Sequence, residues 1–155
     1  MSYSQDEQML NKILTSIINS AAGLKYALIV DDTGITITSY SKFKYSPDDI
    51  SVEKIGAIGG AVFTAGEEQG QILGYGDINL QITEYHKGMI FSVKADNGIL
   101  CLATDPNVNI GFVRVVLKKW APQIGKILKR YLNSEQGAIN EELKELLSSD
   151  TFTFQ

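Results

Sequence analysis

The sequence predicts one α+β domain, a five-stranded antiparallel sheet with helices on its faces. The expected order is helix, two strands, helix, three strands and helix, followed by a short C-terminal helix. Three observations predict this class. Apolar residues recur at helical spacing in three long stretches, and five short stretches read as strands bounded by turn residues. A chain of 155 residues, 44% of them hydrophobic, is also long enough to bury an ordinary core.

The first helix is expected over residues 5–20, where pairs of apolar residues recur every three or four positions. A short apolar run at 26–30 is typical of a strand. The sequence Asp31-Asp-Thr-Gly34 has the composition of a turn, and 35–40 alternates apolar and polar residues. The two strands are therefore expected to form a hairpin.

The central helix is expected over residues 51–70, with Ser51 or Asp49 as its N-cap. Successive residues of a helix are about 100° apart around its axis, so the apolar residues of this segment form two stripes. One stripe is suited to packing against a sheet. That stripe contains Ile55, Ile58, Val62 and Ala65. A second stripe, lined by glycine, lies about a third of a turn away. It contains Val52, Gly56, Gly60 and Phe63.

The second stripe needs an explanation, because each glycine inside a helix costs about 1 kcal/mol relative to alanine. Small residues permit a close approach of two backbones. The approaching helix comes either from a second copy of the chain or from the same chain. We favour the second copy, since the other helices are expected to cover the sheet.

Three further strands are expected to form a meander. Residues 77–85 alternate regularly and place Ile78, Leu80 and Ile82 on one face. The strands at 89–95 and 99–104 follow, each after a short turn sequence.

The last long helix is expected to begin after 105–109 and to continue to about residue 132. Pro122 lies inside it and is expected to kink or split it, because proline cannot donate a hydrogen bond to the carbonyl of residue 118. A linker at 133–137 and a short helix at 138–147 are expected next. The chain would then consist of a domain at 1–133 and an appendage at 134–155 with a linker, a short helix and a tail.

This pattern resembles the Roadblock family of the dynein light-chain type, in its prokaryotic-like single-domain form, across Met9 to Leu132. The resemblance rests on the order of elements and on three segments, ALIVDDTGITITSYS, IGAIGGAVFTAGEEQG and DPNVNIGFVRVVLKK. It implies dimers, of one chain or of paralogues, in which the central helices pack together and neighbouring strands extend the sheet. It also implies that 77–85 is the strand that pairs across the dimer.

Together, the glycine-lined stripe and the resemblance predict a dimer interface on the central helix and the strand after it. The predicted interface residues are Val52, Gly56, Gly59, Gly60, Phe63, Glu67, Ile78, Leu80 and Ile82.

The resemblance also implies function. Roadblock proteins serve as non-catalytic platforms for small Ras-like GTPases, as stimulators of GTP hydrolysis in prokaryotes, or as subunits of motor and signalling assemblies. We therefore expect a non-catalytic homodimeric module that binds and regulates or scaffolds a small Ras-like GTPase. The chain has only two arginines, Arg114 and Arg130, so an arginine-finger mechanism has few candidates. Any stimulation is expected to come from ordering the GTPase's own residues.

A net charge of −4 argues against general nucleic-acid binding, yet no acidic residue occurs from Pro106 to Ser134. This basic helix is interpreted either as a solvated outer face or, more specifically, as a docking face for an acidic partner. The candidate partner face contains Lys118, Lys119, Lys126, Lys129 and Arg130.

Catalytic and cofactor chemistry is not indicated, so no catalytic, cofactor-binding or metal-binding residue is assigned. His86 is expected in a hairpin turn, and Cys101 in a buried strand without an activating partner. The glycines at 56–60 are not followed by the Gly-Lys-Ser/Thr of a phosphate-binding loop, and no carboxylates have the spacing of a calcium loop.

A cytoplasmic location is expected, because there is one cysteine, no signal-peptide pattern at the N-terminus and no apolar run of about eighteen residues. A small-molecule-sensing α+β domain is the alternative function, with Gly56, Gly59 and Gly66 opening a cavity between helix and sheet. The C-terminal appendage, with Phe152 and Phe154, could latch onto the same subunit or reach a partner; we favour the latch.

Overall fold

The computed structural model describes residues 3–42 and 51–148. Its strands form one antiparallel sheet in the order β2-β1-β5-β4-β3. The predicted fold class and order of elements are confirmed. The elements are α1 (Tyr3–Ile18), β1 (Leu24–Val30), β2 (Thr36–Ser41), α2 (Val52–Leu73), β3 (Gln81–Tyr85), β4 (Gly88–Ala95), β5 (Gly98–Thr104) and α3 (Ile110–Ser148).

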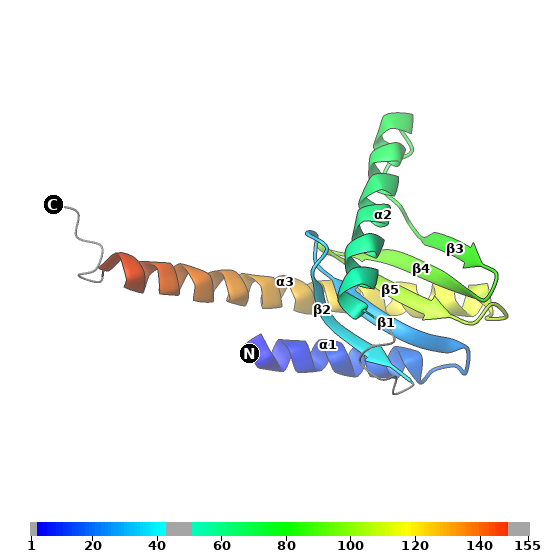
Figure 1. Ribbon diagram of the computed structural model, residues 1–155, viewed down its shortest axis with the longest axis horizontal. Helices are drawn as coiled ribbons and strands as arrows, with labels where there is room; N and C mark the ends of the chain where they lie inside the picture. The colour runs from blue at the N-terminus through cyan, green and yellow to red at the C-terminus, as the bar shows by residue number, and fades with distance from the viewer. Residues whose placement is uncertain (1–2, 43–50, 149–155) are drawn as a thin grey trace.

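One face of the sheet is covered by two helices, α1 and α3, which lie side by side (Figure 1). Their apolar stripes bury the main core against alternate residues of the strands. Its fully buried members include Leu10, Leu14 and Ile17 of α1, Phe91, Leu100 and Leu102 of the sheet, and Leu117, Ile124 and Leu128 of α3. This face is closed to solvent along most of its length.

An ion pair fastens α1 to α3 beside this core. Arg130 Nη2 lies 2.8 Å and Nε 3.0 Å from Asp6 Oδ1. Asp6 has no exposed surface, whereas the Arg130 side chain is partly exposed. The hydrogen bond to Asp6 raises the pKa of Arg130, so the guanidinium remains protonated beside this carboxyl group.

The other face carries one helix, α2, which rises across the sheet (Figure 1). It contacts β1, β2 and β5. A small apolar cluster fills this contact, composed of Leu28, Val30, Phe63, Ile99 and Cys101. A single helix covers this face less completely than α1 and α3 cover the opposite one.

The ends of α2 follow local sequence signals. Ser51 Oγ accepts a hydrogen bond from Lys54 N at 3.3 Å, as an N-cap does. Gly74 ends the helix in the left-handed conformation, with φ of 70°. The prediction of Ser51 as a cap is confirmed, and the alternative, Asp49, lies outside the described residues.

The edge strand β3 is shorter than predicted. The expected strand covered 77–85, but pairing with β4 begins only at Gln81. The reason is a side-chain contact, because Glu67 Oε2 accepts the hydrogen bond from Ile78 N at 3.0 Å. This hydrogen bond keeps Ile78 next to α2, outside the hydrogen-bonded pairing of β3 with β4.

The last helix differs most from expectation. The expected C-terminal helix is present, but it is not separate from the long helix. The segment expected as a linker at 133–137 is helical, and α3 continues without a break from Ile110 to Ser148. Pro122 does not split it either. The expected linker holds one glycine and no proline, so it lowers helix propensity by about 1 kcal/mol without removing a hydrogen-bond donor. The tail with Phe152 and Phe154 lies outside the described residues.

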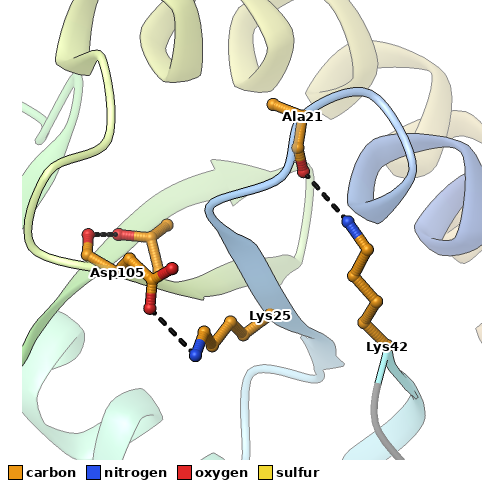
Figure 2. A network of polar contacts seen from close by, with 5 residues as sticks. Ala21, Lys25, Lys42 and Asp105 are labelled. Carbon is orange, nitrogen blue, oxygen red and sulfur yellow. Dashed lines mark hydrogen bonds and ion pairs between the residues drawn. The ribbon is translucent and has the colours of Figure 1, made fainter.

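Polar contacts secure the start of β1 and the entry to α3. Figure 2 shows Lys25 reaching Asp105, with Nζ and Oδ1 2.9 Å apart, and Lys42 Nζ donating to the Ala21 carbonyl at 3.4 Å. Asp105 N also donates to the Gly23 carbonyl at 2.8 Å. These contacts join the start of β1 to the residue that follows β5, and the residue that follows β2 to the loop before β1.

Candidate functional site

The glycine-lined stripe of α2 faces the chain's own sheet. Gly56, Gly60 and Phe63 are buried there. A Cβ added at Gly56 would overlap Thr36 Oγ1, and one added at Gly60 would lie 3.3 Å from Gly34 Cα. The close approach that these glycines permit is therefore to the β1–β2 hairpin, which neither alternative considered. A bulky substitution at Gly60 would therefore disturb the folding of the chain, and it would not report on dimer formation.

The other predicted interface residues of α2 also have contacts within the chain. Val52 is half-buried against the small cluster, and Gly59 faces Cys101, whose Sγ would lie 3.5 Å from an added Cβ. Glu67 holds Ile78 N and lies 3.8 Å from Lys94 Nζ. These residues support the fold of the protomer, and their place in a dimer stays a prediction.

The three residues in and before β3 that were predicted for the dimer interface lie on different faces of the sheet. Ile78 packs against the small cluster under α2. Leu80 and Ile82 pack against the main core on the α1/α3 side. None of the three is exposed on the α2 side of β3, where a partner helix would lie.

The stripe of α2 that we assigned to the sheet is instead exposed. Ile55, Ile58 and Val62 have relative exposures of 37%, 63% and 49%. With the uncovered part of the sheet they line an open apolar groove of about 170 Å³. Its lining from the sheet comes from Gln81, Thr83 and Tyr85 of β3, Ile90 and Ser92 of β4, and Cys101 of β5. We call this surface the α2–β3 groove.

Both stripes of α2 can be recognised in the sequence, but the exposed surface was not predicted. The glycines were expected to mark contact between two helices, whereas here they mark contact between a helix and a hairpin turn. The alternation of β3 was a usable signal, since it places Thr83 and Tyr85 opposite Ile82. Tyr85 is 58% exposed, so its ring adds apolar surface at the edge of the groove.

The basic residues of α3 lie on its outer surface. Lys118, Lys126 and Lys129 are exposed, and Lys119 Nζ lies 5.1 Å from the Trp120 ring centroid. Arg130 differs from the others because it binds Asp6. Four of the five residues of the predicted partner face are thus lysines available on one helix surface.

The two residues considered for nucleophilic chemistry, His86 and Cys101, lie in different environments. His86 is exposed in the β3–β4 turn. Cys101 is buried, with its Sγ 3.4 Å from Ser92 Oγ, and burial raises the pKa of its thiol. A protonated, buried thiol is a poor nucleophile.

Within residues 3–42 and 51–148, no group of three or more His, Cys, Asp or Glu side chains could hold a metal ion. None of the helices within these residues combines the length and the apolar character that a bilayer crossing requires.

Comparison with known proteins identifies relatives in Methanocaldococcus jannaschii. Its uncharacterized protein MJ0310 is 30% identical over 116 residues, which cover 75% of this chain and 96% of the relative. Its uncharacterized protein MJ0714 is 30% identical over 118 residues, which cover 76% of this chain and 95% of the relative. The sequence matches no protein-family model.

Solved structures resemble the fold closely at low sequence identity. The gliding protein MglB of Thermus thermophilus has a TM-score of 0.71 and 14% identity, over 81% of this chain and 92% of that one. A Roadblock/LC7 domain of Streptomyces avermitilis has a TM-score of 0.68 and 13% identity, over 76% of this chain and 96% of that one. The chain therefore belongs to the family of the Methanocaldococcus proteins, and its fold is the Roadblock fold.

Proposed function

We propose that this protein is a non-catalytic, homodimeric interaction module of the cytoplasm that binds and regulates or scaffolds a small Ras-like GTPase. The observation that carries the proposal is the α2–β3 groove, an exposed apolar helix face beside an uncovered part of the sheet. A monomer rarely leaves such a surface exposed without a partner.

A second copy of the chain fits the groove because the surface can complement itself. In a two-fold dimer, Ile55, Ile58 and Val62 of one α2 would pack against the same residues of the other, and every contact would occur twice. Fully burying one such side chain contributes roughly 1.5 to 3 kcal/mol. Each of the three is only partly exposed in the protomer, so it contributes a fraction of that amount, and the six contributions of a dimer act against an association cost of roughly 4 to 15 kcal/mol.

The free edge of β3 supports the same arrangement. Among the described strands, β3 pairs only with β4, so its other edge faces outwards. An open edge of this kind promotes pairing with another strand. Antiparallel pairing of two β3 strands would continue the sheet across the two-fold axis and bring the two α2 helices together above it.

The proposal of a GTPase partner rests on the resemblance to Roadblock proteins. The sequence resembles Roadblock proteins, which serve as platforms for small Ras-like GTPases, and the fold resembles that of MglB. Among the two arginines, Arg130 is bound to Asp6, and Arg114 is exposed on α3. Stimulation of hydrolysis, where it occurs, would therefore come from ordering the GTPase's own residues.

The alternative of a ligand sensor has less support. At Gly56 the gap between α2 and the sheet has no room for a Cβ, so the expected internal cavity is filled there. The α2–β3 groove, at about 170 Å³, is smaller than the roughly 300 Å³ at which ligand pockets usually begin. A larger hollow of about 360 Å³ at the other side of α2 is open to solvent and has charged side chains in its lining, Asp32, Glu67 and Lys94 among them, whereas ligand pockets are mostly apolar.

The dimer is tested by light scattering of the full chain and two variants. We expect twice the chain mass for the wild type and a single chain mass for Ile58→Asp, because the new carboxylate would be buried in the interface. Ala61→Asp is the matched control, since Ala61 is exposed on the same helix but outside the groove. A monomeric wild type, or a dimeric Ile58→Asp, would refute the interface.

The GTPase is tested by affinity capture from the native lysate, run separately with a GTP analogue and with GDP, followed by mass spectrometry. We expect a Ras-like GTPase to be enriched in the GTP-analogue sample. Capture of no GTPase in either sample would remove that part of the proposal and leave the dimer standing.

A further inference from the structure

The outer side of α3, turned away from the sheet, is basic. Its exposed cations are Arg114, Lys118, Lys119, Lys126 and Lys129. At about 100° per residue these five side chains fall within an arc of about 140° around the helix axis. The buried residues of the helix, among them Val113, Leu117 and Ile124, occupy the opposite side. The five cations therefore point directly away from the core.

Little negative charge lies near these cations. The sequence has no acidic residue from Pro106 to Ser134. Within residues 3–42 and 51–148, none of the five cations forms an ion pair. One acidic residue, Asp96 of the β4–β5 turn, reaches the edge of the arc beside Gly125. The outer side of α3 thus has a strong net positive charge.

The outer side of α1 extends this surface. Its exposed side chains Gln8, Lys12 and Ser16 recur at helical spacing and include one cation and no acid. Glu7 is half-buried and lies on the opposite side of α1. Because α1 and α3 lie side by side on one face of the sheet, their outer sides form one broad surface (Figure 1). We call it the α1/α3 outer face.

The C-terminal part of α3, which extends beyond the sheet, keeps the same polarity (Figure 1). At about 100° per residue, the three glutamates of residues 139–148 fall outside the arc of the cations. Leu143, Lys144 and Leu147 fall within that arc, and all three are exposed. The outer side of the whole helix is therefore basic and apolar, and its acidic side chains are turned away.

The apolar residues among the cations favour a lipid bilayer over a soluble polyanion. Val115 is 66% exposed and Pro122 is exposed, and both lie in the middle of the arc. A nucleic acid or an acidic peptide would attract the lysines but would gain nothing from these apolar groups. At the boundary between headgroups and acyl chains, apolar side chains are buried while neighbouring lysines contact anionic headgroups.

The net charge of −4 does not oppose such a contact. The acidic residues of α2 lie on the other face of the sheet (Figure 1). A helix with its side chains is about 10 to 12 Å across, and the Debye length is about 10 Å at 0.1 M salt. The charge of α2 is thus largely screened at the α1/α3 outer face.

We propose that the α1/α3 outer face binds the surface of an anionic lipid bilayer, with α3 lying along the headgroups. The contact uses neither α2 nor β3, so it leaves the α2–β3 groove free. One consequence rests on the proposed function. Antiparallel pairing of two β3 strands has its two-fold axis perpendicular to the sheet, so both outer faces of the dimer point the same way. The dimer therefore binds the bilayer more tightly than one chain does.

The test is flotation of the full chain with lipid vesicles. One set contains about 30% phosphatidylglycerol in phosphatidylcholine, and the other contains phosphatidylcholine alone. We expect binding to the anionic vesicles only, weakened at least about tenfold when salt is raised from about 100 mM to about 500 mM. Equal binding to both compositions, or binding to neither, would overturn the proposal.

Charge reversal locates the contact. Lys118→Glu and Lys126→Glu should each weaken binding to the anionic vesicles at least about fivefold, and the double variant at least about twentyfold. Lys54→Glu is the matched control, because it changes the net charge equally at an exposed position of α2. It should bind as the wild type does. A loss as large for Lys54→Glu would show that net charge, and not this face, governs binding.

Two further measurements separate the occupants and the two proposals. A short DNA duplex bound as tightly as the anionic vesicles at the same salt would overturn the choice of a bilayer. The Ile58→Asp chain should still bind anionic vesicles, more weakly than the wild type. A monomeric wild type that binds vesicles would refute the dimer alone, and a dimeric wild type that does not bind them would refute only the bilayer contact.

Discussion

The two faces of the sheet differ in how completely they are covered. On one face, α1 and α3 enclose a core in which Leu10, Phe91 and Leu117 have no exposed surface. On the other, α2 alone covers a cluster of five buried residues and leaves a groove beside it. The first face supplies most of the buried apolar area, and therefore most of the folding stability. The second has apolar surface available for association.

Substitutions on the two faces should therefore differ in how much they destabilise the chain. The stability measurements use the Ile58→Asp background, so that dimer formation does not contribute to the free energy of unfolding.

The largest effect is expected from truncating a phenylalanine on the closed face. Phe91→Ala should lower the free energy of unfolding by about 3 to 5 kcal/mol, because Phe91 is fully enclosed and its cavity cannot collapse. Phe63→Ala, on the α2 face, should cost about 3 kcal/mol or less, since water and neighbouring side chains at the adjacent hollow can fill the space. Urea denaturation measures both. Equal losses, or a larger loss for Phe63→Ala, would show that the α2 face is as tightly packed as the other.

The ion pair between α1 and α3 is expected to respond asymmetrically. Arg130→Ala leaves the fully buried Asp6 carboxylate without its cation, whereas Asp6→Ala leaves an arginine that already reaches solvent. We expect Arg130→Ala to lower the thermal unfolding midpoint more than Asp6→Ala does. Scanning calorimetry of both variants measures this. The reverse order would mean that burial of Asp6 contributes little to the cost.

Adjacent glycines of α2 should respond in opposite directions to the same change. Gly59→Ala should stabilise the chain by up to about 1 kcal/mol, because the added Cβ meets only Cys101 Sγ at 3.5 Å and alanine favours the helix. Gly60→Ala should lose that gain or destabilise by a similar amount, because its Cβ would lie 3.3 Å from the Gly34 backbone. Thermal and urea unfolding of the two variants provide the comparison. A gain for both would show that the hairpin turn yields easily.

The smallest effect concerns Cys101, at the floor of the α2–β3 groove. Its pKa is raised above the ordinary value of 9.0 by burial, so the unfolded chain loses this proton at a lower pH than the folded chain does. The resulting stability is present below pH 9.0 and is lost as pH rises from there towards the folded pKa. Urea denaturation at increasing pH, compared with Cys101→Ala, measures the difference. A wild type that loses no more stability than Cys101→Ala above that pH would contradict the assignment.

Much of the fold could be predicted because it depends on local patterns. The turn at Asp31–Gly34 is a local structure, in which Asp31 Oδ1 accepts hydrogen bonds from Thr33 N and Ile35 N, both at 2.9 Å. The alternation in β4 likewise determines which of its side chains enter the main core. Such signals lie within a few residues of one another, so they can be read without knowing the tertiary structure.

The candidate site could not be predicted in the same way. The sequence shows two apolar stripes on α2, but which one faces the sheet depends on how closely the β1–β2 hairpin approaches Gly56 and Gly60. The length of β3 likewise depends on a side chain eleven positions away, since Glu67 holds Ile78 N outside the ladder.

The order of the elements, the five antiparallel strands and the segregation of charge along the last helix could thus be read from the sequence, because each depends on residue type and spacing. The orientation of α2 could not. That its glycines face the chain's own hairpin, and that Ile55, Ile58 and Val62 remain exposed, follows from packing in three dimensions. A helix with two apolar stripes turns towards the sheet the one whose small residues allow the closest contact.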